Sequence, residues 1–350
     1  MDNTLITGLE ELESHLRFVV EDPATPLDAK LFDEVELQLN ESNIPSLIPR
    51  ILPYLTKILL TYEQDPAILA SLSIKLIKPI KFTQALTLAS EDALIRALRS
   101  PAPSVNILAI SILEKATKSP GDTAILSIMK GMVENFLRTW LSTPDVGVGE
   151  KATNVLGDLL DTDCDRRSSA GLTTKMNGLQ IRSVPGQGLL WRRIFQDRAV
   201  YDVIFSLCSS TGQLDARQKS LAQGRLLRLL PRLAALDFKT VTSSQFPDIE
   251  KKYGIGQLGI LYFATVDMVN KEEDPLMHII SMETFAELLE RMSKTELTTP
   301  TLDYLAVLVK KVTTSDPPMY KHLEAIAMSP EVAETSPELV DLLVKLNEYP

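Results

Sequence analysis

The chain has few side chains whose types could support catalysis or bind a metal ion. Its two cysteines, Cys164 and Cys208, and its three histidines, His15, His278 and His322, are far apart in the sequence. Two cysteines cannot form a disulfide framework or a four-cysteine zinc site, and they fit a reducing compartment. Cys164 lies in the acidic run DTDCD, where carboxylates disfavour the reactive thiolate, and Cys208 lies in the apolar-rich run VIFSLCSS. We therefore expect no catalytic residue, no cofactor and no metal ion, and a protein that is not an enzyme.

One motif could bind a dinucleotide. Residues 254–259, GIGQLG, match the glycine spacing of the dinucleotide fingerprint. That fingerprint requires a strand before the glycines, so that the turn delivers a pyrophosphate to the next helix. The preceding residues PDIEKKY are charged and poor in strand-forming types. The sequence instead predicts a glycine-rich turn that opens a helix from Ile255 to Asn270.

Arginines gather on one side of a helix predicted from Asp215 to Ala234. At about 100° per residue, four arginines fall within an arc of about 80°, with one leucine inside the arc and other leucines on the opposite side. We call this set the basic stripe; it comprises Arg217, Leu221, Arg225, Arg228 and Arg232. Because the guanidinium group matches carboxylates bidentately, the stripe predicts contacts with acidic groups of a partner protein.

A matching set lies on a helix predicted from Asp145 to Asp161. Its members follow one another at i, i+4, i+8 and i+11, with apolar residues behind them. We call this set the acidic stripe; it comprises Glu150, Asn154, Asp158 and Asp161. Two interpretations are open. Either the stripes bind a partner, or they pair with each other or face solvent, since surface charge pairs are common and individually weak.

The elements that position these residues are helices. Apolar residues recur at i, i+3 and i+4 in many long segments, and no segment combines strand alternation with hairpin turns. The helical segments are Ile44–Leu60, Ser104–Thr117, Thr123–Leu141, Asp215–Leu236, Pro275–Met292, Thr301–Val312 and Pro337–Leu346. The fold class is therefore all-α.

The breaks between these segments repeat. A small capping residue followed by proline is a pair that begins helices. Such pairs start at Asp22, Asp65, Ser100, Ser119, Thr143, Asp274, Asp316, Ser329 and Ser336. The distance from Asp65 to Ser100 is 35 residues, from Ser100 to Thr143 it is 43, and from Asp274 to Asp316 it is 42. A period of about 40 residues is typical of HEAT and armadillo repeats. We predict a HEAT/armadillo-like α-solenoid, a curved rod of stacked helical repeats; the alternative is a compact, irregular helical bundle.

Residues 161–188 interrupt this pattern, because they are polar and rich in Gly, Ser and Thr. They predict a long loop, which divides the chain into N-terminal repeats over 1–162, a flexible loop over 163–187 and C-terminal repeats over 188–350. Structureless loops of this length are either functional or merely flexible, and both readings are open.

The charge balance excludes several partners and locations. The net charge of −10 does not suit binding of nucleic acid by the whole surface, although residues 166–232 hold 12 basic and 3 acidic residues. The longest apolar-rich stretch, 253–266, is shorter than the roughly 20 residues of a membrane span, and the acidic N-terminus does not resemble a signal peptide. We expect a cytosolic protein, with the nucleus as an alternative, that binds neither membrane nor nucleic acid.

Three runs resemble a known family. They are PDVGVGEKATNVLGDLL at 144–160, GQGLLWRRIFQDRAVYDVIFSLCS at 186–209 and RQKSLAQGRLLRLLPRLAALDF at 217–238. Together they resemble the fungal branch of the 26S proteasome non-ATPase regulatory subunit 5 family, whose fungal members are often labelled DNA mismatch repair proteins. The strong resemblance covers about residues 140–290, and outside it we expect only the helical-repeat character to agree. Members of this family are usually longer than this chain, so we expect the chain to lack the last repeats.

The resemblance implies a function that the composition does not show. Members of the family are HEAT-like assembly chaperones of the proteasome regulatory particle. The implied partners are the C-terminal domain of a proteasomal AAA ATPase subunit and other assembly intermediates of the base, and the implied mechanism is steric hindrance of docking to the core particle. Alone, the chain is expected to be a monomer. The alternatives are a DNA mismatch repair-associated scaffold and a generic HEAT-repeat adaptor that binds another protein.

Overall fold

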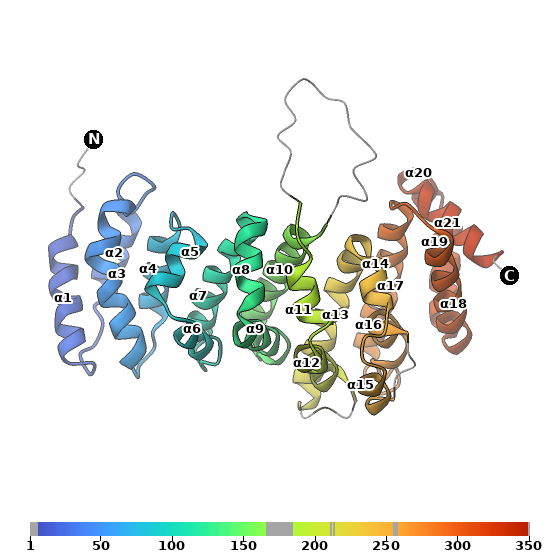
Figure 1. The fold of residues 1–350 in the computed structure, drawn as a ribbon, viewed down its shortest axis with the longest axis horizontal. Coiled ribbons are helices and arrows are strands. Elements are labelled where there is room, and N and C mark those ends of the chain that lie inside the picture. Colours follow the sequence, from blue (N-terminus) through green and yellow to red (C-terminus); the bar gives the residue numbers. More distant parts are fainter. Residues whose placement is uncertain (1–5, 166–184, 211, 213, 255–257, 349–350) are drawn as a thin grey trace, which may run out of the picture. The chain divides into compact units, whose positions relative to one another are not determined.

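The computed structural model describes residues 6–165, 185–210, 212, 214–254 and 258–348. Within these ranges the chain is helical and has no strand, so the all-α prediction is confirmed. The chain divides into two compact units, Met1–Thr139 and Trp140–Pro350. Each unit is a stack of helices that follow one another in chain order (Figure 1).

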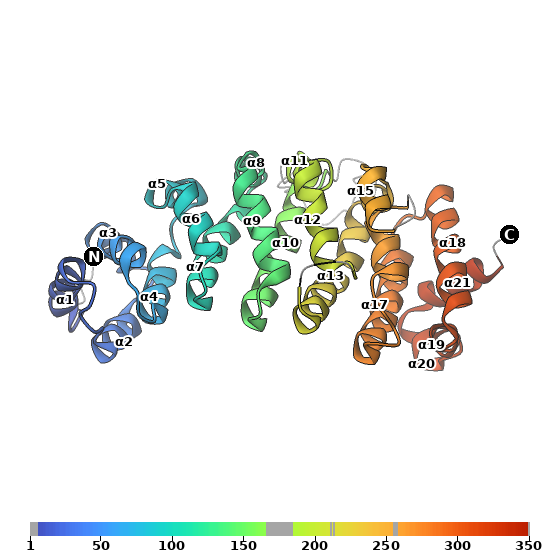
Figure 2. The same ribbon diagram turned by 90° about the horizontal axis from the view of Figure 1, so that it is seen from below.

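The described residues of the first unit form nine helices and one 3-10 turn, and the last of these helices continues into the second unit. Their bounds are α1 Leu9–Glu21, α2 Ala29–Gln38, α3 Ile44–Thr61, α4 Ala67–Ile77, α5 Phe82–Leu88, α6 Glu91–Leu98, α7 Pro103–Glu114, η1 Lys115–Lys118, α8 Pro120–Ile128 and α9 Lys130–Ser142. Helix α1 packs on α3, α3 on α4, α4 on α7, and α6 on α7. Figure 2 shows this order from a second side.

Apolar side chains on one side of each helix make the core of this unit. Helix α3 buries Leu47, Ile51, Leu55 and Ile58, which recur at the spacing of one helix face. A helix of this kind cannot bury such a face alone, so its stability depends on its neighbours in the stack.

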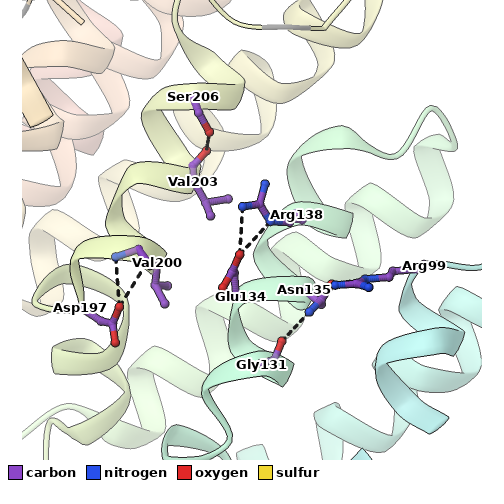
Figure 3. Close-up of polar contacts among 10 residues, drawn as sticks. Arg99, Gly131, Glu134, Asn135, Arg138, Asp197, Val200, Val203 and Ser206 are labelled. Atoms are coloured by element: carbon purple, nitrogen blue, oxygen red, sulfur yellow. Dashed lines mark hydrogen bonds and ion pairs between the residues drawn. The ribbon is translucent and has the colours of Figure 1, made fainter. Parts of the chain in front are cut away.

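Polar side chains satisfy the carbonyls at helix ends, which lack partners within their own helix. The side-chain Nδ2 of Asn106 on α7 donates to the backbone carbonyls of Ala97, Leu98 and Ser100, at and just after the end of α6. The distances are 2.9, 3.0 and 3.0 Å. On α9, Asn135 accepts from Nε of Arg99 and donates to a carbonyl of its own helix (Figure 3). These bonds fix the position of each helix relative to the next.

The second unit contains the remaining helices. Their bounds are α10 Val146–Asp163, α11 Leu189–Phe195, α12 Arg198–Cys208, α13 Ala216–Leu236, α14 Phe238–Thr242, α15 Pro247–Lys252, α16 Gly259–Tyr262, the π-helix η3 Phe263–Asp267, α17 Pro275–Ser293, α18 Thr299–Ser315, α19 Pro317–Ala327, α20 Pro330–Thr335 and α21 Pro337–Asn347.

Helix α13 lies between α10 and α17, and α17 also packs on α21 (Figures 1 and 2). A Cβ at Gly224 of α13 would lie 3.8 Å from the sulfur of Met277 on α17, an ordinary contact distance that leaves room for a methyl group. Beside them, Asp197 caps α12 by accepting from the amides of Ala199 and Val200 (Figure 3).

The predicted proline signals mark helix starts at several places. Helices α8, α17, α19, α20 and α21 all begin at the proline of such a pair. At Thr143-Pro144 the helix begins two residues later, because Asp145 accepts from the amide of Val148 and takes the capping position. At Asp22-Pro23 the pair ends a helix instead of beginning one, since Asp22 is the C-cap of α1.

One predicted helix differs from the structure. The helix predicted over Thr123–Leu141 is broken at Met129, whose backbone is not helical, so α8 and α9 are separate. The predicted division of the repeats by a loop over 163–187 stays a prediction, because residues 166–184 lie outside the described residues. Helix α10, just before that loop, packs on α11 and α13.

Candidate protein-binding surface

Arg225 of the basic stripe is a buried residue that closes the end of α9. It is only 8% exposed, and its Nη1 donates to the carbonyls of Trp140, Leu141 and Thr143 at 2.9, 3.3 and 2.8 Å. Its Nη2 donates to the carbonyl of Asp145 at 3.1 Å. Burial lowers the pKa of the Arg225 guanidinium, although Asp145 opposes this shift. The expectation that Arg225 lies on an exposed binding face is therefore wrong, because its side chain is buried and its guanidinium is bonded to four backbone carbonyls.

Two glycines of α10 make room for the arginines of α13. A Cβ at Gly149 would overlap Nε and Cζ of Arg225, closer than the 3.0 Å that real Cβ atoms keep. A Cβ at Gly157 would lie 2.5 Å from Nη1 of Arg232. Because the glycines are eight residues apart, they lie on one side of α10, and that side faces α13.

Arg232 joins the two stripes. Its Nη2 lies 2.8 Å from Oδ1 of Asp158 and 3.4 Å from Oδ2 of Asp161, and its side chain is 32% exposed. A charge pair of this exposure contributes little to folding, on the order of 0–1 kcal/mol. Of the two interpretations, internal pairing of the stripes therefore applies to Arg232.

Arg228 makes a looser contact with the acidic stripe. Its Nη1 lies 3.8 Å from Oε1 of Glu150, and the two side chains are 69% and 59% exposed. Arg217 and Asn154 are also exposed, and Leu221 is half-buried. The partner-binding role stays a prediction for this exposed set, which we call the α10–α13 face: Arg217, Arg228, Glu150, Asn154 and Asp158. It presents both signs of charge, which suits a partner surface that also carries both.

The comparisons with known proteins bear on the helices that carry this face. Residues 9–167 match the family model described as "DNA mismatch repair protein HSM3, N terminal domain", a range that runs from α1 through α10. We call this matched range the HSM3-type domain, a name that records the similarity. No curated protein matches the chain.

This match agrees with the resemblance of the sequence runs, since the description of the matched family carries the mismatch-repair label of the fungal members. It also extends the likeness to residues 9–139, where we expected only the helical-repeat character to agree. Helix α10 and the acidic stripe lie inside the HSM3-type domain, whereas α13 and the basic stripe lie after it. The contacts of Arg225 and Arg232 therefore link the end of that domain to the helices that follow.

The sequence analysis missed Asp163, a buried residue at the end of the HSM3-type domain. Its Oδ2 accepts from the backbone amides of Leu190 and Trp191 at 2.7 and 3.1 Å, and its carbonyl accepts from the amide of Gly188. The indole of Trp191 donates to the carbonyl of Leu160 at 2.8 Å. These bonds hold the start of α11 against the end of α10. The sequence gives no signal for this role, because an aspartate just before a polar segment is expected to face solvent.

The cysteines have the surroundings of structural residues. Cys164 is half-buried, and burial together with Asp237, Asp163 and Asp165 raises the pKa of its thiol to about 11. Cys208 is fully buried, and burial raises the pKa of its thiol further. Thiols of this kind are poor nucleophiles at neutral pH, because they stay protonated.

The other candidates for chemistry also have structural roles. Nε2–H of His278 donates to Oδ2 of Asp316 at 2.7 Å, in agreement with a structural histidine. The glycines of GIGQLG follow the helix α15 and not a strand, and Ile255, Gly256 and Gln257 lie outside the described residues. Within the ranges that the structure describes, no three potential metal ligands come together, and no helix is long and apolar enough to cross a bilayer.

Proposed function

We propose that this chain is a non-enzymatic assembly chaperone of the proteasome regulatory-particle base. The observation that carries the proposal is the match of residues 9–167 to an HSM3-type N-terminal domain. It agrees with the resemblance of the runs over 144–238 to the regulatory subunit 5 family, whose fungal members carry the mismatch-repair label. The proposed partner is the C-terminal domain of one ATPase subunit, alone or within base assembly intermediates.

The proposed mechanism is steric and needs no reacting group. A stack of helices offers contacts spread over many residues, and its bulk hinders docking of the bound ATPase to the core particle. The α10–α13 face contributes charge-assisted hydrogen bonds, which are stronger than neutral ones. We expect the chain to act as a monomer in the cytosol, with the nucleus as a second location.

The description of the matched family favours a second candidate, a scaffold for DNA mismatch repair. Its support in the sequence is the excess of basic residues over 166–232. Within the described part of that segment, however, Arg193, Arg198 and Arg232 pair with carboxylates, and Arg225 faces backbone carbonyls. Arginines that are paired or buried are less available to phosphates, so Arg217 and Arg228, which are exposed, are among the residues of this segment that the DNA proposal would need.

One binding experiment separates these candidates. The full chain is immobilised and titrated with the isolated C-terminal domain of each ATPase subunit of the base, at physiological salt. The chaperone proposal predicts saturable binding to one domain and much weaker binding to the others. Binding to none of them contradicts it and leaves the generic HEAT-repeat adaptor as the better description.

The same immobilised chain is then titrated with duplex DNA at low and at physiological salt. The mismatch-repair candidate predicts binding whose affinity falls steeply as salt rises, because phosphate contacts release counterions. Absence of DNA binding at low salt removes that candidate. A competition step tests the mechanism: the ATPase domain bound to the chain should fail to dock on the core particle until the chain is displaced.

A further inference from the structure

An apolar groove lies in the first unit, within the HSM3-type domain. Helix α3 forms one wall, with Leu52, Leu59 and Leu60, and α5 and α6 form the other, with Leu88 and Ala93. Its floor comes from α4 and α7, which pack on each other. The groove has a volume of about 770 Å³.

Large apolar side chains at the groove are exposed although burial would favour them. Leu60 is 55% exposed on the α3 wall, and Leu88 is 39% exposed on the opposite wall. Small residues, Ala89, Ala93 and Ala97, line the α5–α6 wall and leave room for the side chains of a ligand. Covering the exposed part of these leucines removes apolar surface from water, which favours a complex.

Charged residues of opposite sign border the two walls. Glu63 follows the end of α3, next to Asp65, while Arg96 lies on α6. Glu63 and Arg96 are exposed. Among the residues that the structure describes, no ion pair or hydrogen bond involves the side chain of either one. A ligand in the groove therefore meets a negative border on the α3 side and a positive border on the α6 side.

We propose that this groove binds an amphipathic α-helix of a partner protein. The apolar side of that helix packs between Leu60 and Leu88, a basic flank faces Glu63, and an acidic flank faces Arg96. An extended peptide could not add to the walls as a strand, because both walls are helices whose backbone groups are bonded internally. A helix seated between two others instead uses the ridge-into-groove packing of the rest of the stack. This inference does not depend on the proposed ATPase partner.

The test uses three synthetic 14-residue helical peptides and the full chain. All three carry leucines at the same four positions on one side. The first has lysines along one flank and glutamates along the other, the second has lysines along both flanks, and the third has glutamates along both. Fluorescence anisotropy of labelled peptide gives each affinity. The proposal predicts that the mixed peptide binds at least tenfold more tightly than the other two.

Charge variants of the groove then change the preference in a defined way. Arg96→Glu makes both borders acidic, so the lysine-flanked peptide should bind best. Glu63→Lys leaves the α6 border basic and weakens the acidic one, so the preference for the mixed peptide over the glutamate-flanked peptide should shrink or reverse. An order of affinities that neither variant changes overturns the proposal. Reversing the direction of the mixed peptide exchanges its flanks between the two walls, so this peptide should bind in the direction that places its lysines beside Glu63.

Apolar variants locate the peptide. Leu60→Glu and Leu88→Glu should each lower the affinity for the mixed peptide at least tenfold, with unchanged helical circular dichroism because both positions are exposed. Ile128→Glu on α8 is the matched control, since Ile128 is 73% exposed and lies outside the groove lining. Equal effects of all three variants place the peptide elsewhere. A concentration-dependent dimer that Leu60→Glu abolishes would identify a second copy as the occupant and overturn the proposal.

Discussion

The guanidinium of Arg225 occupies the space that a side chain at Gly149 would fill. Any Cβ at Gly149 would overlap the guanidinium, and the guanidinium in turn bonds the carbonyls of Trp140, Leu141 and Thr143. One missing side chain on α10 thus lets one arginine of α13 reach the end of α9. Three helices are held together by this contact, and each partner depends on the other.

Replacing Arg225 should destabilise the fold. Arg225→Met keeps most of the side-chain volume but leaves the carbonyls at the end of α9 without their donor. A buried polar group without a partner costs about 1–3 kcal/mol, so we expect a loss of about 3 kcal/mol in the free energy of unfolding. Urea denaturation followed by circular dichroism measures it. Arg228→Met is the control, since its exposed side chain predicts a change within about 0.5 kcal/mol; similar losses for both variants would contradict this role of Arg225.

Gly149→Ala should destabilise the protein although alanine is the better helix former. The added methyl group displaces the Arg225 guanidinium, and overpacking of this kind costs about 1–3 kcal/mol. Gly224→Ala on α13 is the matched control. Its Cβ would meet only ordinary contacts, the nearest at 3.8 Å, so the gain in helix propensity of up to about 1 kcal/mol should appear there. Thermal denaturation of both variants should move the midpoint in opposite directions.

The sequence predicts the order in which the arginines of the basic stripe are exposed, but not how deeply each one is buried. On a helical wheel Arg217 and Arg228 lie near one edge of the arc, Arg232 lies at about 60° and Arg225 at about 80°, nearest the leucines. Exposure follows that order, from 69% for the side chain of Arg228 through 32% for Arg232 to 8% for Arg225. The helical wheel alone cannot show which arginines are buried, because burial depends on how closely the neighbouring helix α10 approaches α13. The missing side chain at Gly149 leaves the space that the Arg225 guanidinium occupies.

Local patterns predicted the helices themselves, as the agreement at α3, α13, α17 and α21 shows. Long-range contacts were beyond the sequence. The carboxylate of Asp163 meets amides 27 and 28 residues further on, across a segment with no periodicity. The groove between α3 and α6 also has no sequence signal, since its walls look like ordinary amphipathic helices until their neighbours are placed.

Asp163 should give the stability of the protein an unusual pH dependence. Burial raises the pKa of this carboxyl, and hydrogen bonds from the amides of Trp191 and Leu190 offset only part of that shift. The folded state then binds more protons than the unfolded state between the ordinary aspartate pKa of about 3.9 and the raised pKa, so stability falls as pH rises through that window. Asp163→Asn cannot titrate. The free energy of unfolding of the natural protein, relative to this variant, should increase as pH is lowered toward 4.

Asp316 should behave in the opposite way. Burial alone would raise the pKa of its carboxyl, but hydrogen bonds from Lys271 and His278 outweigh burial and lower it. The stability that Asp316 contributes is present above about pH 3.9 and is lost as pH falls through the lowered pKa. Relative to Asp316→Asn, the natural protein should therefore lose stability as pH falls below 4. If both aspartate variants changed the pH dependence in the same direction, the assignment of one of the two carboxyls would be wrong.

Reversing the exposed arginines of the α10–α13 face should weaken partner binding without unfolding the chain. Arg217 and Arg228 face solvent, and the single ion pair of Arg228 spans 3.8 Å at the surface, so its loss costs little folding free energy. In a complex that excludes water, each arginine bonded to a carboxylate contributes about 1.5–3 kcal/mol. The double variant Arg217→Glu with Arg228→Glu should therefore lower the affinity for the ATPase C-terminal domain at least tenfold, since about 1.4 kcal/mol corresponds to one decade.

The control for that double variant is the double variant Arg291→Glu with Lys294→Glu at the end of α17, two exposed cations that also pair with carboxylates, here Glu287 and Glu290. It changes the net charge by the same total amount but lies outside the α10–α13 face. Equal losses of affinity for the two variants would mean that net charge steers binding and that the face has no special role, because long-range steering depends on total charge and fades with salt. A loss confined to the double variant of the α10–α13 face, and kept at physiological salt, would mean that the arginines make direct contacts. That outcome would assign the exposed part of the two stripes to the partner and the buried part, Arg225, to the fold.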